Sequence, residues 1–550
     1  FRPERLLVHE VLIRVTADLA VYAGRNYEDL GINFRRMAAA ILDETILLHR
    51  NEFQSLFEET RAAVSDWIKH ELDATLFAVA VTEPARKAPS VLARLFGRQT
   101  VSEPSHPIPR SDNEGLAATL TDWLDRSVAS QNELESACVK ALHRVAGGVA
   151  GRHGRIVGDR ELITSIAATL VMNEYGSAVL GQALEPYFQD AISEQGFRRL
   201  PVQAKPVVMN TKGASASGKS TMRPYQHSLA ERIGVPWDDF ALISPDIWRK
   251  YLLDYEGLGA AFKYAGMMTG HEIDAIDRKL DRYMARKAAA GNMSHLLIDR
   301  FRFDSFVPES DADEPVRLLT RFGDLVYMFF MITPPEETIV RAWRRGQMVG
   351  RYKAVDDLLA HNIEAYSGMP ELFFTWTLRT DKRVHCEFLD NTVPLGSRPR
   401  TVAYGWNGEL NILDVKAMID VDRFRKVNVR ATRPEDVYPP DEVIAARNTD
   451  FLQKCAKLLP VINFADQRTG RIFARMEGGT WTWCDPAALA DAVRDKDVAE
   501  GMAALGLPRN GRDWTSDHIP AMQRLDADDA HTIGNWGPSA QVPVAGSFAG

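Results

Sequence analysis

The sequence has few cysteines, no excess of basic residues and no long hydrophobic run, and each absence narrows its function. The four cysteines are Cys138, Cys386, Cys455 and Cys484, which lie far apart and form no C-x-x-C pair. A disulfide framework and a cysteine zinc site are therefore not expected, and a reducing, cytoplasmic location fits. A secreted effector is the alternative, because the chain opens at Phe1 rather than methionine and a targeting segment could precede it.

Charge and hydropathy weigh against two further classes of protein, nucleic-acid binders and membrane proteins. The chain has 66 basic and 74 acidic residues, which gives a net charge of −8. A protein that grips long nucleic acid by its phosphates needs an extended basic surface, so a nucleic-acid partner is possible but not favoured. No apolar run approaches the ~18 residues of a membrane span, so no membrane partner is expected.

The 550 residues divide into three regions of different pattern. Residues 1–200 are predicted to be helical, because apolar residues recur at three- and four-residue spacing, with a proline-rich linker at about 96–114. Residues 201–395 alternate short apolar runs with helix-compatible segments, which predicts a mainly parallel sheet and an α/β fold. Residues 396–550 are predicted to form a small α+β domain with an irregular tail.

Strands are expected in the central region at 207–210, 240–243, 296–298, 325–332 and 384–389. Two later hairpins are expected around Asn407-Gly408 and 477–479, where glycine stands between strand-like runs.

Other local expectations concern turns, helices and one aromatic pair. The glycine-rich run 147–154 is interpreted as a turn, and helices are expected at 441–459 and 486–505. Trp481 and Trp483 are two residues apart, which predicts that both rings lie on one face of a strand.

The strongest motif follows the first expected strand and fits the phosphate-binding spacing G-x-x-x-x-G-K-[ST]. Its residues are Gly213, Ala214, Ser215, Ala216, Ser217, Gly218, Lys219, Ser220 and Thr221. Glycines let the backbone curl so that its N–H groups face phosphate oxygens, and the next helix adds partial positive charge. Lys219 would reach the β- and γ-phosphates of ATP or GTP, and the Ser220 hydroxyl would bind Mg²⁺. The alternative is a Gly/Ser-rich surface loop.

Carboxylates follow the next two expected strands. Asp246 could accept a proton from a substrate hydroxyl, and Arg249 could hold a substrate anion; alternatively Asp246 caps a helix. Asp299 could orient Mg²⁺ or water, or simply end its strand in a turn. Thr269 and Glu272 lie between these strands and are candidates to contact the substrate, although a helix cap is an equal alternative.

A basic segment at 341–353 carries five positive charges and no negative one. Arg341, Arg344 and Arg345 fall on one helical face, and glycines at 346 and 350 could let the segment hinge. Phosphoryl transfer needs cations against the charge that develops on the transferred group, so we expect a lid that contacts the nucleotide. The alternative is a solvated basic helix.

These features together resemble the zeta-toxin and polynucleotide-kinase branch of P-loop kinases, over about residues 206–391. The resemblance depends on 213–221, Asp246-Ile-Trp-Arg249, Met268-Thr269, 296–299, Arg341, Gly350-Arg351 and 388–391. It implies that Lys219 and Ser220 bind nucleotide phosphates and Mg²⁺, and that Asp246 activates the acceptor hydroxyl. It also implies that Arg249 and Thr269 face the substrate, while Arg341 and Arg351 stabilise the transferred phosphoryl group.

One departure concerns the substrate. Zeta toxins usually carry Glu-Gly-Thr where this chain has Asp299-Arg-Phe, so the pocket need not suit a UDP-linked amino sugar. The resemblance predicts a Mg²⁺-dependent kinase that moves the γ-phosphoryl of ATP or GTP to a hydroxyl of a nucleotide-sugar, nucleoside or dinucleotide, with a toxin-like role as one candidate.

Two other functions and one partner stay open. The alternatives are a nucleotide-hydrolysing switch or ATPase that regulates its flanking domains, and a polynucleotide 5′-hydroxyl kinase. The resemblance also suggests an antitoxin-like partner, because zeta systems include a helical antitoxin that blocks the nucleotide site. Residues 1–200 could be such an inhibitor fused to the kinase.

Overall fold

A computed structural model describes residues 1–22, 24, 29–77, 113–254, 257–264, 268–299, 319–349, 353–394, 397–507 and 523–538. The chain forms two compact units. The helical unit comprises residues 1–12 and 38–196, and the sheet unit comprises residues 13–37 and 197–550. Within the described ranges, no helix is both long enough and apolar enough to cross a membrane.

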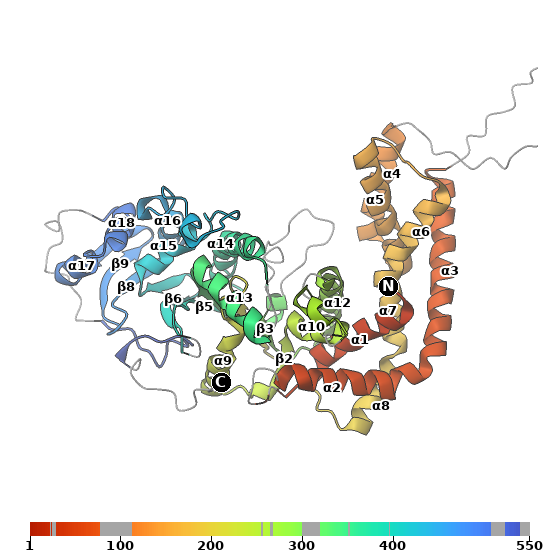
Figure 1. Cartoon of the computed structure of the whole chain (residues 1–550), viewed down its shortest axis with the longest axis horizontal. Helices are drawn as coiled ribbons and strands as arrows, with labels where there is room; N and C mark the ends of the chain where they lie inside the picture. The colour runs from red at the N-terminus through yellow and green to blue at the C-terminus, as the bar shows by residue number, and fades with distance from the viewer. Residues whose placement is uncertain are drawn as a thin grey trace, which may run out of the picture. The chain divides into compact units, whose positions relative to one another are not determined.

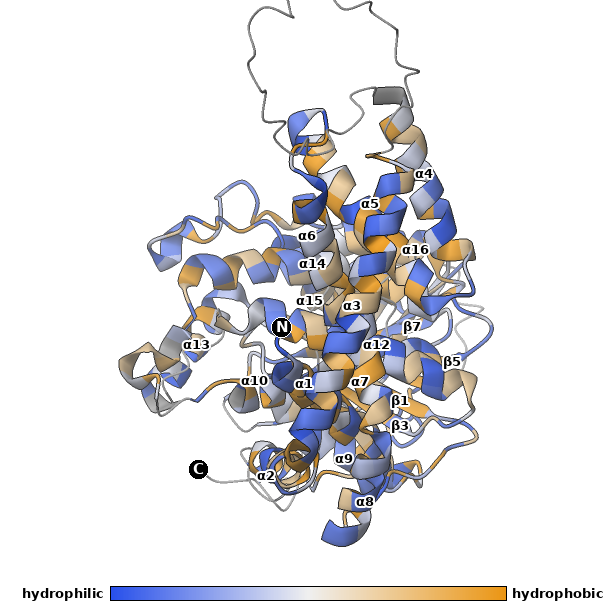
Figure 2. Cartoon of the chain, turned by 90° about the vertical axis from the view of Figure 1, so that its right-hand side faces the viewer, coloured by the Kyte–Doolittle hydropathy of each residue, from blue (hydrophilic) through white to orange (hydrophobic). Residues whose placement is uncertain are grey.

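The first eight α-helices carry the N-terminal part of the chain. They are α1 (Pro3–Asp18), α2 (Asp29–Glu44), α3 (Arg50–Ala74), α4 (Asn113–Ala129), α5 (Glu133–His153), α6 (Arg160–Val171), α7 (Ser177–Ala183) and α8 (Glu185–Gln195). Helices such as α3 and α5 mix hydrophilic and hydrophobic residues along their length (Figure 2). On α3 the buried side chains include Val64, Ile68 and Leu72 at four-residue spacing, so the helical prediction is confirmed there.

The glycine-rich run at 147–154 was predicted to be a turn, and this prediction is wrong. Helix α5 continues through Gly147, Gly148 and Gly151 and ends only at Gly154, which has a φ of 69°. Each helical glycine costs about 1 kcal/mol relative to alanine, but tertiary packing overrides that preference. Asn132 caps the start of α5, and the helix buries Cys138, Val139 and Leu142.

The predicted linker at 96–114 lies almost wholly outside the described residues. Its last two positions are Asn113 and Glu114, and both already belong to α4. Helix α4 packs within the helical unit, where the Arg126 guanidinium lies 2.7 Å from a Glu71 carboxylate oxygen on α3.

The sheet unit contains one ten-stranded sheet in the order β10-β9-β8-β7-β6-β5-β4-β1-β3-β2. Figure 1 labels β2, β3, β5, β6, β8 and β9 of this sheet. The strands are β1 (Val207–Lys212), β2 (Phe240–Ile243), β3 (His295–Asp299), β4 (Leu325–Ile332), β5 (Arg383–Asp390), β6 (Arg400–Trp406), β7 (Glu409–Ile412), β8 (Val461–Ala465), β9 (Ile472–Glu477) and β10 (Thr480–Cys484). Strands β2, β3, β1, β4 and β5 are parallel neighbours. The remaining pairs are antiparallel except β7 with β8. The protein is therefore α/β with a large mixed sheet.

The predicted boundary near residue 395 falls inside this sheet. Strand β5 pairs with β6 in antiparallel register, with His385 opposite Trp406 and Cys386 opposite Gly405. Strands from the predicted kinase and C-terminal regions are thus hydrogen-bonded neighbours.

Both faces of the sheet are covered. Val326, Met328 and Phe330 of β4 share one core cluster with residues of α14 (Val355–Thr377), α15 (Val415–Arg423), α16 (Asp450–Leu458) and α18 (Lys496–Ala504). The alternate residues Tyr327 and Phe329 share another cluster with residues of α9 (Arg223–Arg232) and with Ile533. This alternation follows from the two-residue period of a strand.

Several local expectations in the C-terminal part are confirmed and others are wrong. Both hairpins form, as β6–β7 and β9–β10. The helix predicted at 441–459 is shorter, because α16 starts at Asp450 after a 3₁₀ turn at Ala445–Arg447. The helix predicted at 486–505 is two helices, α17 (Pro486–Ala492) and α18, because Asp495 caps the start of α18.

The prediction that Trp481 and Trp483 share a strand face is wrong. A register shift lies between them, with Trp481 opposite Met476 and Trp483 opposite Arg475. An extra residue in a strand breaks the two-residue alternation of side chains. Trp481 therefore packs against one core cluster and Trp483 against another.

Residues 13–22 are part of the sheet unit, although they were predicted to belong to a separate helical domain. The buried Trp248 indole N–H of α10 (Pro245–Leu252) donates to Thr16 Oγ1 at 3.0 Å. Asp18 accepts a 2.5 Å hydrogen bond from the Tyr283 hydroxyl of α12 (Gly270–Ala289) and also pairs with Lys287. The end of α1 thus packs on the two helices that follow β2.

Candidate functional site

The motif 213–221 lies at the carboxyl end of β1 and leads through a 3₁₀ turn at Lys219–Met222 into α9. Its two spaced glycines are required by their surroundings. A Cβ on Gly213 would lie 2.7 Å from Met331 Cβ, and one on Gly218 would lie 2.3 Å from Asn391 Nδ2. Gly218 has a φ of 95° and Ala216 a φ of 63°, so the backbone curls through the left-handed region twice. The structure therefore forms a tightly held loop at the end of the strand.

The Ser217 carbonyl is the anchor of this loop. It accepts hydrogen bonds from Asn391 Nδ2 at 2.7 Å, from Thr333 Oγ1 at 3.1 Å and from Arg341 Nη1 at 3.5 Å. The donors come from the ends of β5 and β4 and from α13 (Pro335–Val349). The loop conformation is thus set by three segments distant in sequence.

Arg341, which the sequence suggested would face the transferred phosphoryl group, bonds main-chain carbonyls in this structure. Its Nη2 atom donates to the Asn391 carbonyl, and its Nη1 atom donates to the Ser217 carbonyl. Burial lowers the pKa of Arg341 from its usual range. The geometry makes this guanidinium a support for the loop backbone.

The loop lysine folds back on its own loop. Lys219 Nζ donates to the carbonyls of Gly213 at 2.9 Å and Ala214 at 2.8 Å. The N–H groups of Ser217 and Thr221 donate to the backbone carbonyls of Ala214 and Gly218 within the loop. N–H groups of such a loop are suited to an anion, and the lysine would have to leave its carbonyls to reach one.

Ser220 and Asp299 meet as expected from the sequence. The Ser220 hydroxyl donates to Asp299 Oδ2 at 3.0 Å, and Arg223 Nη2 lies 3.6 Å from the same oxygen. Oxygens held ~2.0–2.1 Å from one octahedral Mg²⁺ in adjacent positions lie about 2.9 Å apart, so this pair fits the ion. No cluster of three His, Cys, Asp or Glu side chains suited to a metal occurs in the described ranges.

The predicted acceptor side is also brought together. Arg249 Nε lies 3.3 Å from Asp246 Oδ1, and Arg249 Nη1 donates to the buried Thr269 hydroxyl at 3.2 Å. Ser244 occupies the N-cap position of α10, so Asp246 is not the cap. Glu272 lies half-buried in the first turn of α12. Asp246, Arg249 and Thr269 thus form a polar cluster between α10 and the start of α12.

The sequence did not reveal one pair of neighbouring side chains, Lys353 and His361. Lys353, which precedes α14, has its Nζ atom 2.5 Å from His361 Nδ1 on that helix. Burial lowers the pKa of Lys353 to about 8, while Asp357 raises it and the cations Arg249, Lys219 and Arg345 lower it further. Burial, with help from Lys353, Lys219 and Arg249, lowers the pKa of His361 to about 3. No motif marks His361, because its place is set by the packing of α14.

The two halves of the site lie at one edge of the sheet. Strands β1, β3 and β2 are parallel neighbours, so the loop after β1, Asp299 at the end of β3 and the Asp246–Arg249 pair after β2 all follow carboxyl strand ends. Lys219 and Arg249 each lower the pKa values of Lys353 and His361. Arg345 of α13 also lowers the pKa of Lys353. Gly350 and Arg351, which were predicted to belong to the lid, lie outside the described residues.

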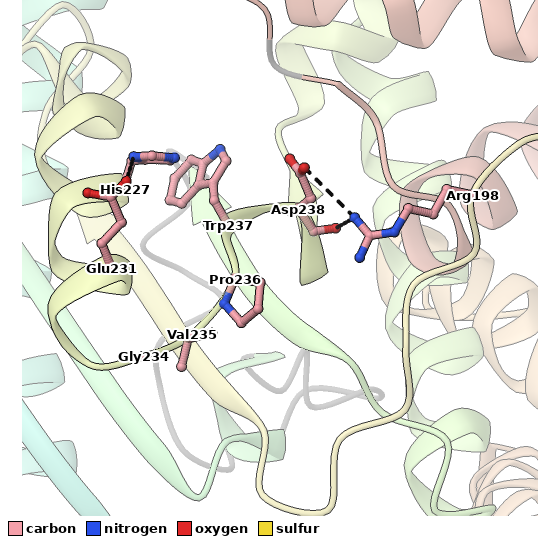
Figure 3. Close-up of a pocket in the computed structure, with 8 residues that line it drawn as sticks. All are labelled: Arg198, His227, Glu231, Gly234, Val235, Pro236, Trp237 and Asp238. Atoms are coloured by element: carbon pink, nitrogen blue, oxygen red, sulfur yellow. Dashed lines mark hydrogen bonds and ion pairs between the residues drawn. The ribbon is translucent and has the colours of Figure 1, made fainter.

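A cavity of about 560 Å³ lies elsewhere, beside the amino end of β2 (Figure 3). Trp237 and the His227 ring contact each other there, with ring centroids 5.1 Å apart. His227 is paired with Glu231 at 3.5 Å, and Arg198 approaches Asp238 at 3.8 Å. In these two contacts each charged group has a partner of opposite charge. The cavity lies at the amino end of β2, whereas the loop lies at the carboxyl end of β1.

The loop lies at a topological switch point. From β1 the chain goes to β2 on one side of the sheet, and from β4, the neighbour of β1, it goes to β5 on the other. Ligands of open α/β sheets bind outside the carboxyl ends of strands at such a point. Comparisons with protein-family models, curated proteins and solved structures gave no match for this chain.

Proposed function

We propose that the sheet unit is a Mg²⁺-dependent kinase that transfers the γ-phosphoryl group of ATP or GTP to a hydroxyl of a small molecule. One observation carries the proposal. The Ser220 hydroxyl of the loop meets Asp299 at the end of β3 at 3.0 Å, and the Asp246–Arg249 pair follows the parallel neighbouring strand β2. A phosphate cradle and a carboxylate base are the two parts that phosphoryl transfer to a hydroxyl needs in one cleft.

The nucleotide side would work through backbone amides and one lysine. Lys219 exchanges the carbonyls of Gly213 and Ala214 for β- and γ-phosphate oxygens when a triphosphate enters. Ser220 and Asp299 would hold Mg²⁺, and the ion, when bound, offsets charge on the phosphates. The clamped Ser217 carbonyl keeps the loop curled, so little backbone reorganisation is needed on binding.

The acceptor side would supply the base. The hydroxyl oxygen of the acceptor forms a bond to the γ-phosphorus, and the bond from that phosphorus to the bridging β–γ oxygen breaks. The hydroxyl proton passes to Asp246, and the nucleoside diphosphate leaves. Arg249 orients Asp246 through their 3.3 Å contact, and it is itself held by Thr269. A nucleotide-sugar, nucleoside or dinucleotide offers a suitable hydroxyl.

The test is a transfer assay. The full chain is incubated with γ-labelled ATP or GTP, Mg²⁺ and a metabolite extract, and the labelled products are identified. Asp246→Asn is expected to lower transfer by about 10²–10⁴-fold while nucleotide binding persists. The matched control is Asp491→Asn, an exposed aspartate of α17 paired with Arg494.

The outcomes separate the alternatives. Label on a small hydroxyl compound supports the proposal, and label on an added oligonucleotide 5′-hydroxyl supports a polynucleotide kinase. Label released only as inorganic phosphate supports a nucleotide-hydrolysing switch. Full transfer by Asp246→Asn would contradict the role of Asp246 as base.

A further inference from the structure

Arg223, the first residue of α9, is held against the carboxylate that is the candidate ligand of Mg²⁺. Its Nη2 atom lies 3.6 Å from Asp299 Oδ2, and the Ser220 hydroxyl donates to the same oxygen at 3.0 Å. The Arg223 and Asp299 side chains are largely buried, with 15% and 13% of their surface exposed. One carboxylate oxygen therefore meets a hydroxyl and a guanidinium at once.

The local backbone places these two donors side by side. Ser220 lies in the 3₁₀ turn at Lys219–Met222, and α9 begins directly after this turn. Side chains three residues apart in a 3₁₀ turn point in the same direction, so a serine and an arginine at this spacing can reach one acceptor. The segment Ser220-Thr-Met-Arg223 therefore supplies both a neutral and a positive partner for Asp299.

A second contact fixes α9 over the same strand ends. The buried Gln226 amide donates to the buried Thr211 hydroxyl of β1 at 2.9 Å. Thr211 and Asp299 are register partners in the parallel pair β1–β3. Gln226 comes three residues after Arg223, so the helix face that carries both residues lies against these strand ends. The packing of α9 thus keeps Arg223 beside Asp299.

The charges at this place oppose a further cation. The first turn of a helix carries partial positive charge, which is unfavourable for an arginine unless a carboxylate compensates it. Asp299 provides that carboxylate for Arg223. A divalent cation bound to Ser220 and Asp299 would share the carboxylate with the guanidinium and be repelled by it. The phosphates of a nucleotide would offset this repulsion, because they bring negative charge to the same place.

We propose that Arg223 balances the charge of Asp299 until a nucleotide binds, so that Ser220 and Asp299 hold a divalent cation tightly only together with a triphosphate. This inference rests on the proposed kinase function and adds a residue to its metal site. Arg223 is a positioning residue, because it keeps the Asp299 carboxylate beside the Ser220 hydroxyl. Its charge makes binding of the ion depend on binding of the nucleotide.

The test measures Mn²⁺ binding to the full chain without nucleotide, from the loss of the paramagnetic resonance signal of the free ion. Mn²⁺ accepts the same oxygen ligands as Mg²⁺. Arg223→Met removes the charge, so we expect it to bind Mn²⁺ about tenfold or more tightly than the wild type does. Asp299→Asn in the same background should abolish the gain, which locates the ion.

Two further variants are controls. Arg223→Lys keeps the positive charge and should bind Mn²⁺ about as weakly as the wild type. Arg494→Met removes an exposed arginine that pairs with Asp491 and should leave Mn²⁺ binding unchanged.

An ion pair that only fastens α9 to β3 gives a different result. Arg223→Met would then lower the melting temperature without raising the affinity for Mn²⁺, and this outcome would overturn the inference. If Arg223→Met does not fold, Arg223→Gln takes its place in the same comparison, because glutamine is neutral and still donates hydrogen bonds.

A second measurement separates this inference from the kinase proposal. ATP binding to the wild type and to Arg223→Met is compared in Mg²⁺ and in EDTA. Without the guanidinium, Asp299 repels the phosphates, so we expect metal-free ATP affinity to fall about tenfold and Mg-ATP affinity to fall less. If the wild type binds no nucleotide, the kinase proposal fails, and the Mn²⁺ comparison still decides whether Arg223 controls the ion. If the wild type binds Mg-ATP and transfers phosphate, but Arg223→Met gains no Mn²⁺ affinity, only the role of Arg223 is wrong.

Discussion

The two sides of the candidate site are built in different ways. The nucleotide side is one continuous run of nine residues after a buried strand, clamped from outside by Asn391, Thr333 and Arg341. The acceptor side is assembled from α10 and α12 and is braced by residues 16–18, more than two hundred positions earlier in the chain. A motif can encode the first side almost alone, whereas the second depends on packing between distant segments.

The acceptor-side brace predicts the largest effect. Thr16→Val keeps the side-chain shape but leaves the buried Trp248 N–H without its 3.0 Å acceptor. We expect a loss of about 1–3 kcal/mol in the free energy of unfolding of the sheet unit, measured by denaturant titration. Phosphate transfer should fall more than Mg-ATP affinity, because α10 carries Asp246. Thr16→Ser keeps the hydroxyl and should therefore retain both the stability and the phosphate transfer of the wild type. If Thr16→Ser and Thr16→Val lose equal stability, the hydrogen bond to Trp248 does not support α10.

This brace also changes how the inhibitor hypothesis must be tested. Removing residues 1–200 would delete Thr16 and Asp18 together with the helical unit, so a loss of activity would not report on inhibition. An internal deletion of residues 38–196 spares the brace. If the helical unit inhibits the site, this deletion should raise phosphate transfer.

The clamp on the nucleotide side predicts a smaller and more selective effect. Asn391→Ala removes the 2.7 Å hydrogen bond to the Ser217 carbonyl. We expect nucleotide affinity to fall about tenfold, equivalent to about 1.4 kcal/mol, because the loop is no longer held curled. Calorimetric titration measures it, and Asn428→Ala, an exposed amide away from the loop, is the control. Unchanged affinity would show that the hydrogen bonds from Thr333 and Arg341 are enough to hold the loop curled.

The pKa of Lys353 predicts a pH dependence of stability. Its folded-state pKa is about 8, below the ordinary 10.5, through burial and the cations Arg249, Lys219 and Arg345, with Asp357 opposing them. The protein should gain stability as pH rises between about 8 and 10.5, where only the unfolded chain holds the proton. Denaturant titration across this pH range measures the trend, and Lys353→Met should flatten it.

The smallest expected effect is in the helical unit, away from the candidate site. Gly148 is exposed within α5, and a Cβ there would meet nothing within 4 Å. Gly148→Ala should therefore raise the free energy of unfolding of that unit by about 0.5–1 kcal/mol without changing nucleotide affinity. A loss of stability would contradict the continuous helix.

The sequence predicted best what local pattern determines. Strands β2 and β4 and both hairpins follow from apolar runs and glycine turns. The motif and Asp299 were found because a strand end, a glycine spacing and a carboxylate are visible in one dimension. The predictions that were wrong concern features that depend on tertiary packing. The helix through Gly148 survives because α5 is capped and buried on one side.

The residues that the sequence could not assign share one property. His361 and Thr16 carry no motif, and each gains its role from a side chain that it meets in the folded chain, Lys353 and Trp248 respectively. The bulge that separates Trp481 from Trp483 is likewise invisible to a two-residue period. Long-range geometry supplies these contacts, and no local pattern encodes them.

The central claim is that the loop at 213–221 grips a triphosphate through its amides and Lys219. The most direct measurement is equilibrium binding of Mg-ATP to the wild type and to Lys219→Met under identical salt and pH. The account predicts saturable one-to-one binding by the wild type and a loss of at least about tenfold in the variant. Equal affinity of the two proteins, or no binding by the folded wild type, would contradict it.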